Sequence, residues 1–231
     1  MQPTLDLWLI RHAQPLVDSG VCYGQTDVLA DAAATLLAAQ TLAQQLPQDL
    51  YFLCSPLQRC ELLAHTLCGL RADLSYKKDA RLGEMHFGNW EMRAWAHIPR
   101  SQLDDWTTDF AHHRVGQHGE STMGVVQRVL QALLDTTAQA LSLAGHSIAP
   151  KAIAWITHAG VIRAVAWLME TLALMEQLEP AEQPHPTLSP ARPLSARDWP
   201  QGALRFGRCQ QLRVPSLPQL HRLQKALTSP A

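Results

Sequence analysis

The sequence predicts an α/β fold in which helices cover both faces of a mostly parallel central sheet, a three-layer αβα sandwich. Short apolar runs that match buried strands alternate with longer segments whose apolar residues recur at helical spacing. Two of these runs, residues 5–10 and 153–157, lead within two residues to His12 and His158. Functional side chains collect where parallel strands end, so the pattern also predicts a site at that edge of the sheet.

The first half of the chain alternates predicted strands with predicted helices. Asp31 is a candidate N-cap for an Ala- and Leu-rich helix that Pro47 ends. Ser55 followed by Pro56 is typical of an N-cap and a first helical position, which predicts a second helix directly after a strand. The predicted strands span residues 5–10, 50–54 and 75–78, the last at an edge, and the predicted helices span residues 31–46 and 55–68.

The second half contains two irregular regions. Residues 81–118 carry many Trp, His and Asp residues with little periodicity, which predicts an insertion or lid over one edge of the sheet. Six prolines at residues 180–200 are incompatible with a helix or central strand and predict an extended loop. The other predicted elements are a helix over residues 120–143, a strand over 153–157, a helix from 161, a strand over 206–214 and a mobile polar tail. We expect a single domain over residues 1–231.

The composition limits the possible partners and compartments. The chain has 231 residues, 47% of them hydrophobic, which is enough for a sizeable core. A formal net charge of -1 supplies no basic field for nucleic acid or an anionic membrane, so we expect neither as a partner. The five cysteines show no C-x-x-C spacing, and the N-terminus shows no signal-peptide pattern. Both observations favour a cytoplasmic protein with reduced thiols over a disulfide framework or a zinc site.

Two histidines and two arginines indicate phosphate chemistry. Neutral imidazole is nucleophilic near pH 7, so His12 is a candidate to attack a phosphate ester. The anionic ester repels a nucleophile, and cations around its oxygens are therefore required. Arg11 is adjacent to His12, and Arg59 lies in the first turn of a predicted helix that starts at a strand end. Guanidinium groups match phosphate oxygens in a bidentate way. If the strands before His12 and His158 are neighbours, these side chains surround one phosphate pocket.

Five short blocks carry this chemistry in a fixed order. They read LIRHA at residues 9–13, SPLQRC at 55–60, LGEMHFGNWE at 82–91, GES at 119–121 and THAG at 157–160. In this order they resemble the histidine phosphatase superfamily, also called the phosphoglycerate mutase-like family. The second block matches the family pattern Ser-Pro-Leu-x-Arg-Cys in full, and the third matches Leu-x-Glu-x-x-Phe-Gly-x-Trp-Glu. The resemblance extends from about Leu7 to Val165 and implies the phosphoglycerate mutase-like fold.

The resemblance also implies a role for each site residue. His12 would be the nucleophile that becomes a phosphohistidine. Glu84 would protonate the leaving oxygen and then activate water. This mechanism needs no metal or other cofactor, and we expect none. Arg11, Arg59 and His158 would be the further catalytic groups that hold the phosphoryl group, and Gln14, Gly24, Thr26 and Ala159 are candidate substrate contacts.

Three positions depart from the usual family pattern. Ala13 and Ala159 stand where glycine is common, and Gln14 stands where many relatives have glutamate. Glycine permits a positive φ angle or a close backbone approach, which alanine restricts. Alanine keeps the amide donor, so we expect phosphate binding to be retained.

Local strings favour one branch of the family. Residues 22–28, 87–93 and 119–129 look like the alpha-ribazole-phosphate phosphatases of cobalamin synthesis, which predicts alpha-ribazole 5′-phosphate as the substrate. Broad-specificity and fructose-bisphosphatase-type relatives share parts of these strings. A phosphoglycerate mutase is disfavoured, because residues 104–118 are short for a lid that retains a bisphosphate intermediate. An inactive phosphate- or phosphoprotein-binding module is the alternative of another class, and the intact site residues argue against it.

The aromatic and histidine-rich segments lead to two further expectations. Tyr23, Trp90, Trp95 and Trp106 offer flat faces that could stack on a benzimidazole and ribose, although packing in the core or lid is the more common role of a tryptophan. The histidines at residues 112–118 lack nearby acidic or cysteine ligands, so we predict no metal site there. The expected partner is a small-molecule phosphate ester, and a homodimer is left open.

Overall fold

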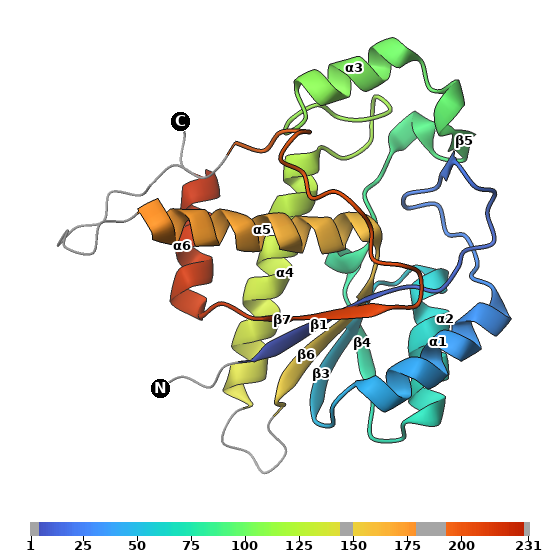
Figure 1. Cartoon of the computed structure of the whole chain (residues 1–231), viewed down its shortest axis with the longest axis vertical. Coiled ribbons are helices and arrows are strands. Elements are labelled where there is room, and N and C mark those ends of the chain that lie inside the picture. Colours follow the sequence, from blue (N-terminus) through green and yellow to red (C-terminus); the bar gives the residue numbers. More distant parts are fainter. Residues whose placement is uncertain (1–4, 144–149, 179–192, 229–231) are drawn as a thin grey trace.

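The computed structural model describes residues 5–143, 150–178 and 193–228. Its centre is a five-stranded sheet in the order β4-β3-β6-β1-β7 (Figure 1). Strands β1, β3, β4 and β6 run parallel, and β7 pairs antiparallel with β1 at one edge. The strand bounds are Asp6–Arg11 for β1, Leu50–Cys54 for β3, Tyr76–Lys78 for β4, Ala152–Thr157 for β6 and Cys209–Arg213 for β7.

Helices cover both faces of this sheet, which confirms the three-layer fold class. On one face, α1 and α2 pack on alternate strand residues such as Ile10 and Ile156. On the other face, α4, α5 and α6 pack on the intervening residues such as Leu9 and Trp155. Successive side chains of a strand point to opposite faces, so one strand supplies two cores. The helix bounds are Ala32–Gln45 for α1, Gln58–Leu70 for α2, Thr122–Ser142 for α4, Ala159–Leu178 for α5 and Leu217–Thr228 for α6.

The central strand β6 is fully buried along its length, as expected for a parallel strand covered on both faces. Helix α5 begins two residues after β6 ends, so the turn between them contains only His158 before the helix. The predicted N-cap of α1 is confirmed, because a carboxylate oxygen of Asp31 accepts a hydrogen bond from the Ala34 amide at 2.7 Å. These features fix the strand ends that carry the candidate site.

Residues 81–118 form a layer of short elements at one end of the sheet. The helix α3, Arg100–Thr108, lies at the top of Figure 1. The two-residue strands β2 (Val21–Cys22) and β5 (Arg93–Ala94) pair and tie this layer to the loop after β1. Three short 3-10 helices complete it, at Ala80–Leu82, Gly88–Trp90 and Trp95–His97.

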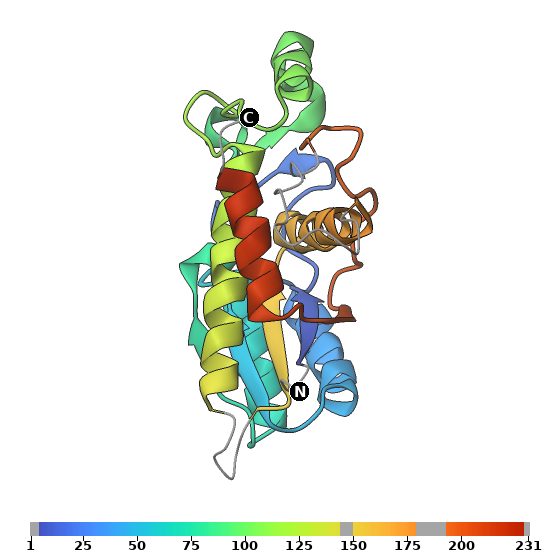
Figure 2. The ribbon, with the colours of Figure 1, turned by 90° about the vertical axis from the view of Figure 1, so that its left-hand side faces the viewer.

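Two local predictions are wrong. Helix α2 starts at Gln58 with Leu57 at its N-cap, not at Ser55 and Pro56. The Ser55 hydroxyl accepts from the Leu57 amide at 3.4 Å and also bonds to His158 at 2.8 Å, ahead of the helix. The chain after β7 is not a mobile polar tail: it forms α6, which lies along α4 (Figure 2). Leu220 and Leu223 of α6 are fully buried, and this three-residue spacing of apolar side chains is the signal that predicts the helix.

The proline-rich loop predicted over residues 180–200 falls largely outside the described residues. Its last part, from Pro193, is described and continues over the sheet edge to β7. Within the three described ranges, no helix has the length and apolar character needed to cross a membrane.

Candidate active site

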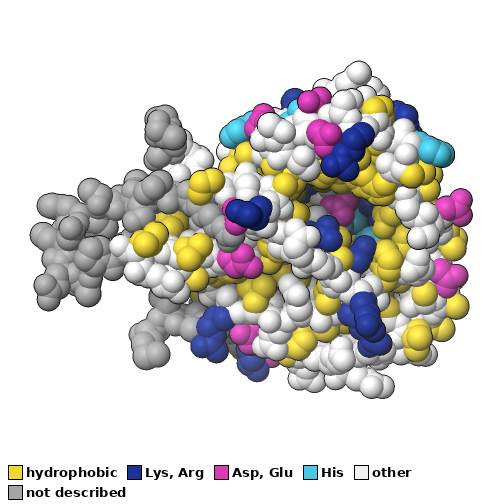
Figure 3. Space-filling model, turned by 45° about the horizontal axis from the view of Figure 1, so that its top comes forward, with side chains coloured by type: hydrophobic (Ala, Val, Ile, Leu, Met, Phe, Trp, Pro, Cys, Tyr) yellow, Lys and Arg dark blue, Asp and Glu magenta, His cyan; other side chains and the backbone are white. Residues whose placement is uncertain are grey.

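The parallel pairing of β1 and β6 brings His12 and His158 together. Arg11 is level with Thr157 in the strand register, and the His12 amide donates to the Thr157 carbonyl at 3.1 Å. The two imidazole ring centroids are 5.1 Å apart. Figure 3 shows a hollow on this side of the molecule, with Lys or Arg, His and acidic side chains inside it and hydrophobic side chains on its rim.

His12 presents a free ring nitrogen. Its Nδ1 lies 2.7 Å from the Ala13 carbonyl oxygen, which can only accept, so Nδ1 carries the proton and Nε2 keeps its lone pair. The side chain is 1% exposed. This burial, with Arg59 as a second cause, lowers the pKa of His12 to about 3. His12 is therefore neutral and nucleophilic over the physiological pH range.

His158 is fully buried, and its polar contacts are made by one ring nitrogen. Its Nε2 lies 2.8 Å from Ser55 Oγ and 3.4 Å from Cys60 Sγ. Burial, and then the neighbouring Arg59, lowers the pKa of His158 well below its ordinary value. The other nitrogen, Nδ1, has no hydrogen-bond partner within the described residues. Since the Ser55 hydroxyl can donate to Nε2, Nδ1 can carry the ring proton toward a ligand.

The two arginines are anchored by backbone carbonyls. Arg59 is completely buried and donates to the carbonyls of Thr26 at 2.9 Å and Gly24 at 2.6 Å. Arg11 donates to the Leu204 carbonyl at 2.8 Å. In both guanidinium groups the buried Nε finds no partner in the described part of the chain. Buried donors are normally paired, so these two groups, with His158 Nδ1, are suited to an anion.

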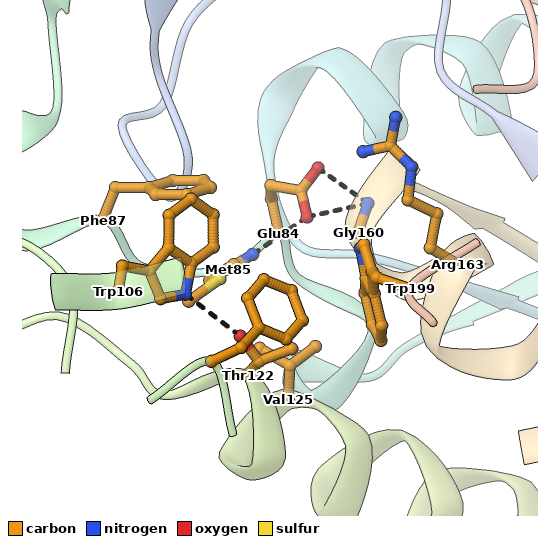
Figure 4. A pocket seen from close by; sticks show the side chains of 10 residues that line it. Glu84, Met85, Phe87, Trp106, Thr122, Val125, Gly160, Arg163 and Trp199 are labelled. Atoms are coloured by element: carbon orange, nitrogen blue, oxygen red, sulfur yellow. Dashed lines mark hydrogen bonds between the residues drawn. The ribbon is translucent and has the colours of Figure 1, made fainter. Parts of the chain in front are cut away.

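Glu84 reaches the same hollow from residues 81–118, the layer of short elements at one end of the sheet. The Gly160 amide, at the N-terminus of α5, donates to both Glu84 carboxylate oxygens at 3.1 and 3.2 Å, and the Met85 amide donates at 3.0 Å (Figure 4). A Cβ on Gly160 would overlap this carboxylate. The position of Glu84 therefore requires glycine at residue 160.

Arg128 of α4 fixes the backbone that carries Glu84. It donates to the carbonyls of Arg81, Gly83 and Glu84 at 2.5, 2.9 and 3.3 Å. It also forms an ion pair with Glu120 at 2.7 Å. These contacts connect the third and fourth sequence blocks.

A cavity opens beside Glu84. Its walls are mainly apolar and aromatic, and Arg163 of α5 is the cation among the residues that line it. Glu84 and Arg163 lie at one side of this cavity, and Phe87 and Trp106 at the other (Figure 4). The full lining is Glu84, Met85, Phe87, Trp106, Phe110, Thr122, Val125, Gly160, Arg163 and Trp199.

The candidate substrate contacts occupy different places. The carbonyls of Gly24 and Thr26 hold Arg59, and the amide and hydroxyl donors of Thr26 both bond to Glu91. Ala159 is the first residue of α5, next to the Gly160 amide that holds Glu84. Gln14 is exposed and lines a separate hollow with residues of α1.

Of the four aromatic residues considered as substrate contacts, one lines the cavity. Trp106 lines it. Trp90 does not: it is 1% exposed, and its indole nitrogen donates to the Gln102 side chain at 2.7 Å, so it packs in the core as expected for most tryptophans. Trp95 packs on Phe87 and Trp90, and the ring of Tyr23 lies 5.3 Å from the Arg59 guanidinium carbon.

Several site residues have no role in the sequence-based hypothesis. Ser55 directly follows β3, so its position at a strand end was a usable signal. Glu91 accepts hydrogen bonds from Gln25, Thr26 and Phe87, and only the folded loops show this. Trp199 lies near the end of the proline-rich stretch and Phe206 at the start of the predicted strand over 206–214, and neither position carries a sequence signal of a site role. Across the described residues, no group of three or more His, Cys, Asp or Glu side chains could hold a metal ion.

The chain is similar to known proteins in sequence family and in fold. A model of the histidine phosphatase superfamily (branch 1) matches residues 7–185. A mycobacterial glucosyl-3-phosphoglycerate phosphatase shares the fold, with a TM-score of 0.67 and 23% identity over 91% of this chain and 90% of that one. The alpha-ribazole phosphatase from Shigella flexneri superposes with a TM-score of 0.58 and 25% identity, over 71% of this chain and 79% of that one. A comparison with curated protein sequences finds no match.

Proposed function

The chain belongs to the histidine phosphatase superfamily, and from this premise we propose that it hydrolyses phosphate monoesters through a phosphohistidine on His12. One observation carries the proposal. Three buried nitrogens without partners in the described residues, Arg11 Nε, Arg59 Nε and His158 Nδ1, belong to side chains that surround a neutral imidazole. Such a set binds a phosphoryl group and leaves its phosphorus open to the histidine.

In the first step, Nε2 of His12 attacks phosphorus. A nitrogen–phosphorus bond forms while the bond from phosphorus to the ester oxygen breaks. Glu84 gives its proton to that oxygen, which leaves as an alcohol. The dianionic phosphate beside the carboxyl group favours its protonated form before transfer. The guanidinium groups of Arg11 and Arg59 stabilise the charge on the equatorial oxygens.

In the second step, water replaces the alcohol. The Glu84 carboxylate takes one proton from the water as its oxygen attacks phosphorus. The nitrogen–phosphorus bond breaks, inorganic phosphate leaves and His12 returns to its neutral form. Glu84 is again protonated, so the cycle closes without a metal or other cofactor.

Alpha-ribazole 5′-phosphate is the substrate that we favour. Its leaving group carries a flat heteroaromatic base, and the cavity next to Glu84 has aromatic walls. The likeness to the Shigella alpha-ribazole phosphatase supports the same choice. A broad-specificity phosphatase is the main alternative within the class.

A phosphate-release screen tests the proposal. The parent, His12→Ala and the exposed control His65→Ala would be assayed with chelator present, on alpha-ribazole 5′-phosphate, phosphoglycerates, fructose bisphosphate and nucleotides. We expect kcat to fall about 10⁴-fold or more in His12→Ala and to be unchanged in the control. Equal turnover by His12→Ala and the parent would reject the mechanism.

The same screen separates the alternatives. Similar low efficiency on many esters would favour a broad phosphatase. Isomerisation of phosphoglycerates that depends on a bisphosphate primer would favour a mutase. Phosphate binding without turnover of any ester would favour an inactive binding module.

A further inference from the structure

A segment beyond the family match covers the nucleophile. The model of the superfamily ends at residue 185, whereas residues 199–208, here called the strap, lie against the ends of β1. The Gly207 amide donates to the carbonyls of Arg11 and His12 at 3.1 and 3.0 Å. Gly207 has a φ of +68°, and a Cβ there would press on Ala38, so glycine is required for this close approach.

Two arginines of the site hold the strap by its carbonyl groups. Arg11 donates to Leu204 at 2.8 Å, and Arg163 donates through Nε to Gly202 at 3.2 Å. The Phe206 ring lies 3.8 Å from the Arg11 guanidinium carbon and 5.3 Å from the His12 ring, centroid to centroid. The strap is thus fixed to the residues that bind the phosphoryl group.

The strap also places Trp199 in the wall of the cavity beside Glu84. Trp199 is half-buried, and its ring meets Phe110 edge-on at 5.8 Å. Phe110 in turn stacks on Trp106 at 5.4 Å with an interplanar angle of 24°. Trp199 therefore belongs to an aromatic wall whose other members come from residues 81–118.

Two further polar groups of this cavity are already bonded, and its cation, Arg163, is bonded through Nε to Gly202. The Thr122 hydroxyl accepts from the Trp106 indole at 3.3 Å, and the Glu84 carboxylate is bonded to the Gly160 and Met85 amides. The ligand group that fits such walls is flat and apolar, because aromatic faces and edges favour stacking and edge-to-face contact. A sugar without a base would leave these aromatic faces uncovered.

We propose that the strap determines leaving-group selectivity, with Trp199 as the residue that recognises the flat heteroaromatic base of a ribosyl 5′-phosphate. The proposal rests on the phosphatase activity proposed above and adds a specificity element outside the matched family region. The ribosyl 5′-oxygen would lie at Glu84, and the base would occupy the aromatic cavity.

A matched pair of substrates isolates the contribution of the base. Hydrolysis of alpha-ribazole 5′-phosphate and of ribose 5-phosphate releases a primary alcohol in both cases, but only the first alcohol carries a base. In Trp199→Leu we expect the ratio of their kcat/KM values to fall about tenfold, as expected for loss of a base–aromatic stack. The value for ribose 5-phosphate should stay within about twofold of the parent.

Two further variants control for folding and packing. Trp199→Phe keeps an aromatic face and should retain most of the preference. Trp95→Leu removes a tryptophan of the same aromatic cluster that does not line the cavity, and it should leave the ratio unchanged. Equal losses on both substrates in Trp199→Leu would overturn the proposal.

The test is separable from the phosphatase proposal. If the parent hydrolyses neither ester, the proposed function fails, and equilibrium binding of the same two esters replaces kcat/KM. A parent that prefers the ribazole ester, with the preference lost in Trp199→Leu, would still support the strap proposal. Equal binding of both esters by the parent would reject it.

Discussion

The floor of the candidate active site and its leaving-group wall are stabilised in different ways. The floor consists of residues that directly follow β1, β3 and β6, and backbone pairing between neighbouring strands fixes it: the Ser55 amide donates to Ile156 at 3.0 Å, and the His12 amide to Thr157 at 3.1 Å. The wall combines residues 84–125 with Arg163 and Trp199. Side-chain contacts between distant segments hold it, such as those of Arg128 and Glu91.

This difference has a physical consequence. A sheet ladder positions its strand ends independently of most side chains, so we expect the floor to tolerate substitutions such as Ala13 in place of glycine. The wall depends on a few partly buried polar side chains, each bonded to several backbone groups. Removal of one partner leaves buried groups unpaired, and the cost then spreads to the whole loop. Changes in the wall should therefore lower stability as well as alter rate and selectivity.

Among the variants that test the comparison of floor and wall, we expect Glu84→Gln to change kcat the most. The variant keeps the shape of the side chain but cannot supply a proton, so kcat for an alkyl ester should fall about 10²- to 10⁴-fold. For p-nitrophenyl phosphate, whose leaving group needs little protonation, the loss should be much smaller. Steady-state kinetics on both esters measure this, and equal losses would exclude Glu84 as the acid.

Gly160→Ala should produce the next largest effect. The added Cβ overlaps the Glu84 carboxylate and displaces it, so we expect kcat to fall about 10- to 100-fold. Ala159→Gly, which introduces the usual family glycine at the preceding residue, should change kcat less than about twofold. If the two variants behave alike in the same assay, the contact between the α5 N-terminus and Glu84 is not what positions the acid.

Glu91→Gln tests the connection between wall and floor. Glu91 bonds the loop whose carbonyls hold Arg59, so vanadate should bind the variant about tenfold more weakly. Inhibition constants for vanadate measure this, together with the midpoint of thermal unfolding. Asp104→Asn, which removes an exposed ion pair with Arg100, is the control and should leave both unchanged. Unaltered vanadate affinity in Glu91→Gln would show that Arg59 is positioned without it.

The pH dependence of stability gives the smallest expected effect and concerns the floor alone. The pKa of His12 is lowered to about 3, and that of His158 is also lowered, chiefly by burial. The unfolded chain takes up these protons below pH 6.5 and the native state does not, so stability is lost as pH falls from there. Each histidine contributes a slope of at most about 1.4 kcal/mol per pH unit.

Urea unfolding at several pH values between 7.5 and 5 measures that slope. His12→Ala should reduce it, because one of the two buried neutral histidines is gone. His65→Ala, at an exposed position of α2, should not change it. A slope that is identical in all three proteins would mean that His12 is free to titrate in the native state.

The sequence-based predictions are accurate where a local pattern marks the element, and less accurate where contacts between distant segments decide it. The strands before His12 and His158, and the helix after His158, are marked by apolar runs of the correct length, and all three are present. The prediction places the start of α2 three residues early, and the contact of the Ser55 hydroxyl with His158, over a separation of 103 residues, has no local signal in the sequence. Helix α6 is absent from the prediction, although Leu220, Leu223 and Leu227 recur at helical spacing.

The sequence by itself determined the family, the parallel α/β class and the residues at the strand ends, since these follow from local patterns and ordered blocks. Only the tertiary structure decided which tryptophan reaches the cavity, that Glu91 and Arg128 hold the catalytic loops, and that the strap covers His12. These features depend on contacts between segments far apart in the chain. Such contacts leave no periodic signal, because each involves one side chain and a few backbone groups of another segment.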